Sequence, residues 1–423
     1  MKICLISNLY NPYILGGAEI YVERIAKYLA KKNEVIIITT KPYEGLSSLK
    51  LSVEIKDNIK IYRFYPLNIY HTYHASNIKI PDFLRILWHI IDLWNIHSYF
   101  IIKKILKKEK PNVVHTHNLS SLSHSTFDAV KSLKFPLVHK IVDCAIICPY
   151  AVLLCPMRNW KICKYPIYPC KIYRKIKNKI VDNKPDIVTA PSQLTLDMHT
   201  KNGFFRYSKK ICLPNGIEID NQFYINNSNF SFDIGGNLKN TKINILYVGG
   251  LTKYKGVHIL INAFKQIKNK NVKLHIVGGG NYQKNLKALA KKDGRITFYG
   301  KLSNEEVQGF YKIGNIVIVP SICYDNLPGV IQESFRVGTP VIGSRIGGLP
   351  ESIKNGHNGF LFEPGNTKQL KEILENIIKN PGQLKELSKN ARKSVEKYEI
   401  SKHVEKLINI YKEAIKLNKQ KYR

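Results

Sequence analysis

The sequence predicts an α/β protein built from two doubly wound parallel-sheet domains. With 423 residues, the chain is longer than one hydrophobic core usually serves, so two domains are expected. Short runs of isoleucine and valine alternate with helix-like segments, a pattern typical of a parallel sheet covered on both faces. A polar stretch interrupts this alternation once, and the same pattern then restarts.

The first half of the chain carries the strands of an N-terminal domain, which we place at residues 1–213. A helix is expected across Glu19–Lys32, where apolar residues recur with helical spacing. The strand-like runs are residues 2–7, 34–40, 112–117, 136–142 and 186–192.

Residues 214–241 are rich in Asn, Ser and Gly and are predicted to be a linker. A C-terminal domain follows at 242–399, and an amphipathic helix at about 400–423 is expected to pack back on the N-terminal domain. In such a pair of domains a ligand is expected at the carboxyl ends of the strands, in the central cleft. The second set of strand-like runs is 244–250, 273–280, 296–300, 315–321 and 340–344.

The chain is strongly basic, with a formal net charge of +35. Such a charge favours anionic partners, namely nucleic acid, an anionic membrane surface or phosphorylated ligands. No nucleic-acid-binding module is recognisable, so no specific nucleic acid is expected. The start, MKICLISNLY, is typical of a buried strand and not of a signal peptide, and no run of 18 apolar residues occurs. We therefore expect a cytoplasmic protein, with peripheral association at the inner face of the plasma membrane.

The cysteines do not form a recognised scaffold or metal motif. Of the eight, three are isolated, and the segment 144–170 contains no C-x-x-C pair. A zinc cluster is therefore weakly signalled, and a structural loop is the preferred interpretation. We expect no metal and no cofactor. The five cysteines of this segment are Cys144, Cys148, Cys155, Cys163 and Cys170.

Two glycine pairs precede expected helices. In LYVGGLTKYKG, Gly249 and Gly250 end a strand and Lys255 stands at the entrance of the next helix. In ILGGAE, Gly16 and Gly17 precede the first helix. Glycines allow a backbone to approach a phosphate, and a helix N-terminus favours an anion. The alternative is that both are tight turns that need glycine for their shape.

Two carboxylates lie in the apolar segment YDNLPGVIQESFRVGTPVIGSRIGGLPE. Asp325 is in a loop before an expected helix that has Pro328 in its first turn, and Glu333 is two turns into that helix. Carboxylates so placed can accept hydrogen bonds from the vicinal hydroxyls of a sugar or ribose. Composition alone favours the alternative, in which Asp325 caps the helix and Glu333 is solvated.

Six motifs follow one another along the chain. The first three are the GGAE loop near residue 16, VVHTH at 113–117 and PNGI at 214–217. The other three are YVGGLTKYKG at 247–256, HIVGGG at 275–280, and the E-x7-E-type segment with GTPVIGSRIGGLPESI through Ile353. With this set the chain resembles the retaining GT-B glycosyltransferases of family four, the "glycosyl transferases group 1" class. The resemblance implies two Rossmann-like domains that face a central cleft. It also implies transfer of a sugar from a nucleotide-diphosphate sugar, with retention of configuration and without a metal.

The resemblance also implies roles for single residues. Glu333 matches the second acid of the pair and should hold the ribose diol, while Asp325 should touch hydroxyls of the transferred sugar. Lys255 should neutralise the diphosphate of the leaving group. The backbone at Gly17 should approach the same phosphates. The other expected donor contacts are Gly16, Gly249, Gly250, Pro328, Gly329 and Val330.

Three positions depart from the family pattern. Asp325 replaces the usual Glu, Gly250 stands where many relatives have an Arg, and Val142 precedes Asp143 where a His is usual. The family His lies beside the donor sugar, and His117 is the better candidate to replace it. His139 is interpreted instead as a satisfied strand histidine.

The leading hypothesis is therefore a retaining hexosyltransferase-type glycosyltransferase (EC 2.4) that acts on a glycan or a lipid-linked acceptor, in surface polysaccharide or glycolipid biosynthesis. The alternatives are a nucleotide-sugar epimerase of related fold and a non-catalytic scaffold that binds anions or a membrane. The segment 83–110, which holds Trp88 and Trp94 and ends in lysines, is interpreted as lying on an anionic bilayer. Its alternative interpretation is a buried helix with a basic end.

Overall fold

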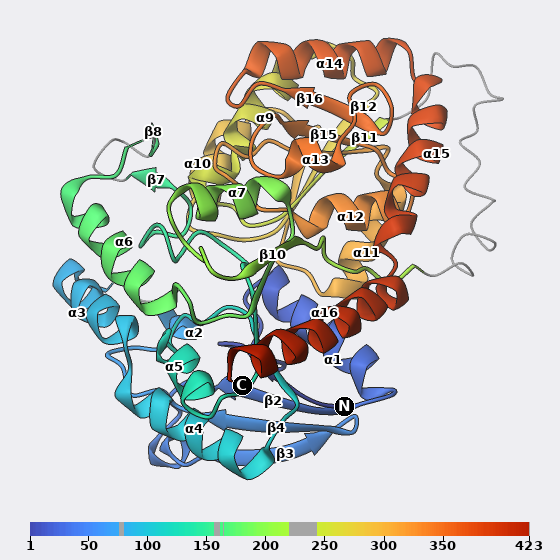
Figure 1. Ribbon diagram of the computed structural model, residues 1–423. Coiled ribbons are helices and arrows are strands. Elements are labelled where there is room, and N and C mark those ends of the chain that lie inside the picture. Colours follow the sequence, from blue (N-terminus) through green and yellow to red (C-terminus); the bar gives the residue numbers. More distant parts are fainter. Residues whose placement is uncertain (76–79, 156–160, 164, 220–242, 423) are drawn as a thin grey trace. The chain divides into compact units, whose positions relative to one another are not determined.

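The computed structural model describes residues 1–75, 80–155, 161–163, 165–219 and 243–422 (Figure 1). The chain divides into two compact units. Unit 1 comprises residues 1–153, 163–216 and 400–423, and unit 2 comprises residues 154–162 and 217–399. The chain thus leaves unit 1 after Gly216 and returns at Ile400, beside the predicted boundaries of 213 and about 400. Most of the predicted linker, from residue 220 onward, lies outside the described residues.

Unit 1 is built on an eight-stranded sheet with the order β10-β9-β6-β5-β1-β2-β4-β3. Every neighbouring pair is parallel except β3 and β4, which form an antiparallel pair. The sequence pattern missed β3 because this edge strand is exposed along its whole length and has no isoleucine–valine run. The strands are β1 Lys2–Ile6, β2 Glu34–Thr40, β3 Ser52–Lys56, β4 Ile59–Phe64, β5 Val113–Thr116, β6 Leu137–Lys140, β9 Ile187–Ala190 and β10 Lys209–Cys212.

Helices cover both faces of this sheet. One face packs against α1 and the C-terminal helix α16, which share a core with alternate strand residues such as Ile59 and Ile61. On the opposite face, Tyr62 donates a hydrogen bond to Glu109 of α4. The helices of unit 1 are α1 Gly17–Ala30, η1 Leu46–Leu49, α2 Thr72–Ala75, α3 Asp82–Leu93, α4 Ile96–Glu109, α5 Ser125–Ser132, α6 Tyr168–Val181, α7 Gln193–Lys201 and α16 Ile400–Lys421.

Unit 2 contains a six-stranded sheet with the order β13-β12-β11-β14-β15-β16, in which all neighbours are parallel. A separate hairpin pairs β7 Leu154–Cys155 with β8 Lys161–Ile162. Together with unit 1, this sheet confirms the predicted class of two parallel-sheet α/β domains. The strands of the sheet are β11 Ile243–Val248, β12 Val272–Val277, β13 Ile296–Gly300, β14 Ile316–Val319, β15 Val341–Ser344 and β16 Gly359–Phe362.

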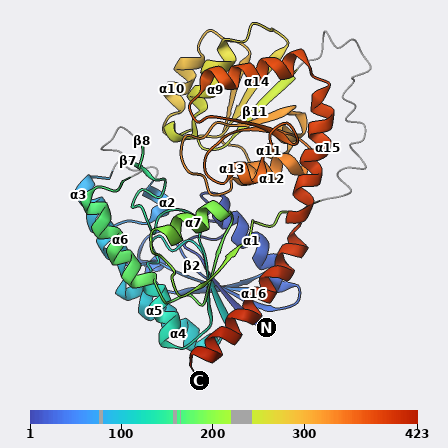
Figure 2. The same cartoon turned by 45° about the horizontal axis from the view of Figure 1, so that its top comes forward.

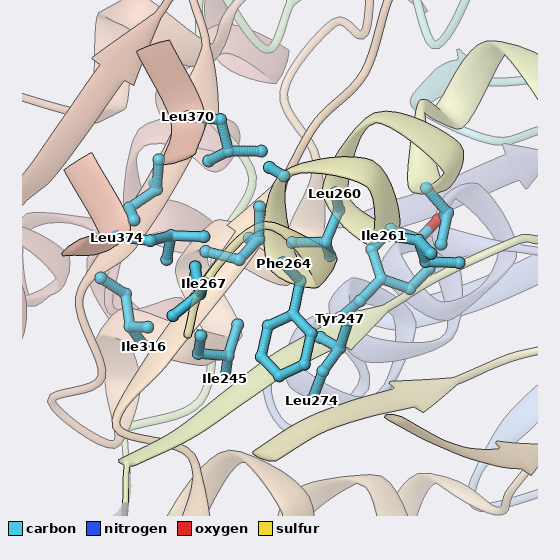
Figure 3. Close-up of a cluster of buried hydrophobic side chains, with 14 of the residues drawn as sticks. Ile245, Tyr247, Leu260, Ile261, Phe264, Ile267, Leu274, Ile316, Leu370 and Leu374 are labelled. Atoms are coloured by element: carbon cyan, nitrogen blue, oxygen red, sulfur yellow. The ribbon is translucent and has the colours of Figure 1, made fainter. Parts of the chain in front are cut away.

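The unit 2 sheet is also buried on both faces, as its continuous apolar strands require. Figure 3 shows one core, in which Ile245 of β11 and Ile316 of β14 lie near Phe264 of α9 and Leu374 of α14. The alternate residues, such as Leu246 and Val317, belong to a second core on the other face, with residues of α12, α13 and α15. The helices are η4 Lys253–Lys255, α9 Val257–Lys265, α10 Gln283–Ala290, α11 Asn304–Ile313, α12 Gly329–Arg336, α13 Leu349–Ser352, α14 Thr367–Lys379, α15 Gln383–Val395 and η5 Glu396–Tyr398.

The segment 83–110 forms two helices, α3 and α4, and not one continuous element. The break falls at Trp94 and Asn95, because the Asn95 side chain accepts a hydrogen bond from the Ser98 amide at 2.9 Å and starts α4. Within the described ranges, no helix combines the length and the apolar character needed to cross a bilayer.

Candidate functional site

In unit 2 the structure brings together Lys255 and Asp325, two residues predicted from different motifs. The Lys255 Nζ lies 2.6 Å from Asp325 Oδ1, and the Ser321 Oγ donates to Asp325 Oδ2 at 2.5 Å. Lys255 ends the short helix η4 after β11, and Asp325 follows β14. Since β11 and β14 are parallel neighbours, their following loops meet at the carboxyl edge of the sheet. This is the edge at which ligands bind in open α/β sheets.

The Lys255 side chain is held in its charged form. Burial alone would lower the pKa of Lys255, but the Asp325 carboxylate outweighs it and raises this pKa above its ordinary value. The ammonium therefore stays positive at neutral pH. A fixed cation at this edge suits an anionic ligand such as a diphosphate.

The loop that carries Asp325 is fixed by close backbone contacts. The Gly348 amide donates to the Asp325 carbonyl at 2.8 Å. A Cβ at Gly347 would lie 2.3 Å from that carbonyl oxygen, so only glycine fits there. Contact with Asp325 thus requires glycine at Gly347, in the Gly-Gly pair of the GTPVIGSRIGGLPESI motif.

The glycines near β11 fall into two classes. A Cβ at Gly256 would lie 1.8 Å from the Pro320 carbonyl oxygen, and one at Gly278 would lie 1.9 Å from the Gly249 carbonyl oxygen. These glycines serve packing, which the sequence analysis did not anticipate for Gly278. Gly250, by contrast, faces open space within the described chain. Packing therefore does not explain Gly250, and its place beside a ligand stays a prediction.

Glu333 lies on α12, a helix whose N-cap is Pro328 and whose first residues are Gly329 and Val330. Its Oε2 accepts a hydrogen bond from Gln308 Nε2 at 2.8 Å. Gln308 belongs to α11 and also accepts a hydrogen bond from Arg336. Neither Gln308 nor Arg336 was predicted, because no local pattern links α11 to α12. The glutamate is therefore held by a side-chain network and is not simply solvated.

In unit 1, the predicted Gly16 and Gly17 stand at the N-terminus of α1. The Gly16 amide donates to Glu19 Oε2 at 2.8 Å, which ties the loop to the helix. Burial raises the pKa of the Glu19 carboxyl. A Cβ at Gly17 would meet nothing within 4 Å, so packing does not explain this glycine.

His117 follows β5 and is buried in unit 1. Burial lowers the pKa of His117 well below its ordinary value, so the ring is neutral. Its ring stands 4.1 Å from that of His115, measured between centroids. His139 on β6 bonds to the Thr116 hydroxyl at 2.9 Å. His117 and His139 line a cavity of about 170 Å³, together with Val142 and Asp143. The sequence did not predict the other polar walls of this cavity, which come from α3 and α6.

No disulfide bond joins any of the eight cysteines, all of which lie within the described ranges. Among the residues that the structure describes, no group of His, Cys, Asp and Glu side chains is arranged to hold a metal ion.

Two family models match the chain. One, described as Glycosyltransferase Family 4, matches residues 15–221, and the other, described as Glycosyl transferases group 1, matches residues 231–394. A 42.6 kDa uncharacterised protein of the cps region of Klebsiella pneumoniae is 27% identical over 370 residues, which cover 86% of this chain and 90% of that protein. An uncharacterised glycosyltransferase of Methanocaldococcus jannaschii is 24% identical over 435 residues, with 99% of each chain covered.

Solved structures resemble the whole chain. Anabaena HepE in complex with UDP has a TM-score of 0.71 at 18% identity, covering 98% of this chain and 100% of its own. Sucrose-phosphate synthase of Thermosynechococcus elongatus has a TM-score of 0.72 at 20% identity, covering 97% of this chain and 98% of its own. At these identities the likeness establishes the architecture, which the chain shares with these proteins over nearly its full length.

Proposed function

The chain belongs to the group 1 glycosyltransferases and has their GT-B fold, and from this premise we propose that it moves a sugar from a nucleotide-sugar donor to a glycan or lipid-linked acceptor with retention of configuration. The cps-region relative supports a role connected with surface polysaccharide. The comparisons do not favour the alternatives of an epimerase or a non-catalytic scaffold.

The pair of Lys255 and Asp325 is the observation that carries this proposal. When the bond between the sugar and the diphosphate breaks, negative charge develops on the leaving phosphate. A lysine that a carboxylate already holds in place can stabilise this charge without reorganising, so it lowers the barrier to the chemical step. Asp325 would position that lysine and meet the sugar hydroxyls.

The remaining donor contacts are proposed from α12. Its first amides, at Gly329 and Val330, lie at a helix N-terminus, where an anion is favoured. Glu333, which Gln308 holds at 2.8 Å, would accept hydrogen bonds from the two ribose hydroxyls. His117, as a neutral ring, would donate or accept a hydrogen bond on the acceptor side. Uridine diphosphate sugars are the first donors to test, because structures of Anabaena HepE hold UDP and UDP-glucose.

The test is a transfer assay with purified full-length protein, UDP-hexoses and a lipid extract as the source of acceptors. We expect release of UDP with one donor, and NMR of the product should show the anomeric configuration of that donor. The Lys255→Met variant should lower kcat by about 100-fold, the usual cost of losing one transition-state contact. Lys287→Met, at an exposed position of α10, is the matched control. An unchanged kcat in Lys255→Met would refute the proposed role.

We also propose that unit 1 binds an anionic membrane surface through α3. The apolar side of this helix faces outward. Its residues Phe83, Ile86 and Ile90 are 64%, 61% and 57% exposed. Its other side buries Trp88 and Asp92. An exposed apolar stripe of this size is typical of an interaction surface.

Lysines lie next to this stripe. Helix α6 lies beside α3 in both views (Figures 1 and 2). The ring of His89 on α3 meets that of Tyr173 on α6 edge to face, with 6.4 Å between the ring centroids. Exposed Tyr168 and Ile172 on α6 extend the apolar surface, and Lys171 and Lys175 add positive charge. From the sequence, the basic part of this surface was expected at the lysine-rich end of the segment 83–110, whereas the structure puts those lysines, within 103–108, on the separate helix α4.

Sedimentation with vesicles tests the membrane proposal. The full chain should bind vesicles of phosphatidylcholine with about one third phosphatidylglycerol, and less so at high salt. The double variant Ile86→Ser/Ile90→Ser should lose most of this binding. Leu46→Ser/Ile55→Ser, which changes two exposed apolar residues elsewhere in unit 1, should retain it. Equal binding by the two variants would contradict the assignment to α3.

A further inference from the structure

The unit 1 cavity is large enough for a ligand. Its volume is about 170 Å³, whereas one molecule of liquid water occupies about 30 Å³. Four segments of unit 1 supply its walls: helix α3, the residues that follow β5, those that follow β6, and helix α6. The space therefore accommodates a compact ring and not only a single bridging water.

Two buried polar groups in its walls have unused hydrogen-bonding capacity. Asp92 is 6% exposed and His117 is 1% exposed. Among the described residues, Asp92 Oδ1 and both ring nitrogens of His117 have no hydrogen-bond partner. Leaving a buried polar atom unpaired costs free energy, so native structures pair nearly all of them. Two such groups on one cavity indicate that a bound molecule completes their hydrogen bonds.

A third group is a buried lysine. Lys177 of α6 has its Nζ 2.9 Å from His124 Nδ1, and an ammonium carries three donors. Its charge is opposed by those of Asp92 and Asp143, both of which also line the cavity. The wall therefore offers donors and acceptors together, with its formal charges nearly balanced.

This chemistry selects the class of ligand. The two aspartates of the wall match its two lysines, Lys177 and the 2% exposed Lys140, so the cavity has no excess positive charge to hold a phosphate or carboxylate. A neutral sugar ring would donate hydroxyl protons to Asp92 and His117 and accept from Lys177. Trp88 and Tyr173 line the same cavity and supply ring surface for the C–H faces of a sugar. We infer that this cavity binds a neutral hexose ring of the acceptor, held by Asp92, His117 and Lys177; calling the ring the acceptor's rests on the proposed function.

Saturation-transfer NMR on the full chain tests this inference directly. The probes are the methyl glycosides of glucose, galactose, mannose and N-acetylglucosamine. We expect saturation transfer to the ring protons of at least one glycoside. At pH 8, where the Asp92 carboxyl is ionised, Asp92→Asn should weaken that binding by about 10- to 100-fold, the value of a hydrogen bond to a charged group. Asp128→Asn, an acid of α5 outside the cavity, is the matched control and should bind like the wild type.

The outcomes are distinguishable. Asp92→Asn must first keep the thermal unfolding midpoint of the wild type or exceed it, because it removes a buried charge that lacks one of its partners. Lys177→Met provides a second variant if it does not. Absence of saturation transfer with all four glycosides, displacement of the glycoside by inorganic phosphate, or equal binding by wild type and both cavity variants would overturn the inference.

A parallel titration with UDP separates this inference from the proposed function. Binding of UDP without any glycoside overturns the sugar cavity alone. If a glycoside binds and UDP does not, the result supports the sugar cavity and contradicts the proposed donor site.

Discussion

At the scale of single residues, Asp92 has an environment that favours its protonated form. Burial raises the pKa of Asp92 to about 7, although Lys177 and the Ser121 amide act in the opposite direction. His89 of the same helix also lines the cavity, and its pKa is lowered to about 4 by burial, so it is neutral at pH 7. The carboxyl of Asp92 therefore titrates near neutral pH, as does the amine of Lys140 in the same wall, whose pKa burial lowers to about 7.

The sign of the resulting pH effect follows from linkage. Between about pH 4 and pH 7, folded Asp92 keeps a proton that the unfolded chain releases, so this group reduces the free energy of unfolding as pH rises. Asp92→Asn removes the effect and should stabilise the protein more at pH 8 than at pH 5. Urea unfolding, followed by circular dichroism, measures this difference, with Asp128→Asn as the control. The same stabilisation at both pH values would contradict the assigned pKa.

Some site residues were predictable from the sequence and others were not. Lys255 and Asp325 stand directly after buried strands, and parallel strands bring their carboxyl ends to one edge, so their proximity follows from the fold class. Asp92 and Lys177 lie on different helices, and no short pattern connects them. Their meeting depends on how α3 and α6 pack, which a one-dimensional pattern does not encode.

At the scale of elements, Gly256 connects η4 to α9 and fixes the position of Lys255. Its φ is +72°, and an added Cβ would lie 1.8 Å from the Pro320 carbonyl oxygen. Gly256→Ala should therefore lower the free energy of unfolding by more than about 1 kcal/mol. Gly309→Ala makes the same change within α11, where nothing lies within 4 Å, and it should stabilise by about 0.5–1 kcal/mol. Thermal unfolding distinguishes the two; destabilisation of equal size in both would contradict this explanation.

The elements also show where the sequence pattern reaches its limit. Most buried strands were found because their isoleucine–valine runs are continuous, but β4 and β16, which are buried and mix aromatic, basic or glycine residues into the run, were missed. The edge strand β3 and the break between α3 and α4 were missed too, because both lack an apolar signal: β3 is exposed, and the break depends on one asparagine cap. The outward apolar face of α3 explains why residues 83–110 could be interpreted as either a membrane-binding or a buried segment.

At the scale of the whole molecule, the two-domain fold class was predictable from the sequence. The kind of anionic partner that the positive net charge attracts was not. Each unit has its own sheet and its own hydrophobic cores, as the repeated alternation of strands and helices predicted. The charge of +35 indicates anionic partners in general, but it does not distinguish a membrane from a diphosphate. That distinction depends on local geometry: a lysine held by Asp325 in unit 2, and lysines beside an exposed apolar stripe in unit 1.

The most direct test of the central claim, that unit 2 binds a nucleotide-sugar donor, is calorimetric titration of the full chain with UDP, GDP and ADP and their common sugar conjugates. We predict saturable binding of one nucleotide and its sugar, with one site per chain. Glu333→Gln should weaken it by about tenfold or more, because a neutral amide accepts hydrogen bonds from the ribose hydroxyls less strongly than a carboxylate does. Glu372→Gln, on α14, should leave it unchanged. No binding of any nucleotide, or equal affinity in Glu333→Gln and the wild type, would contradict the donor site proposed for unit 2.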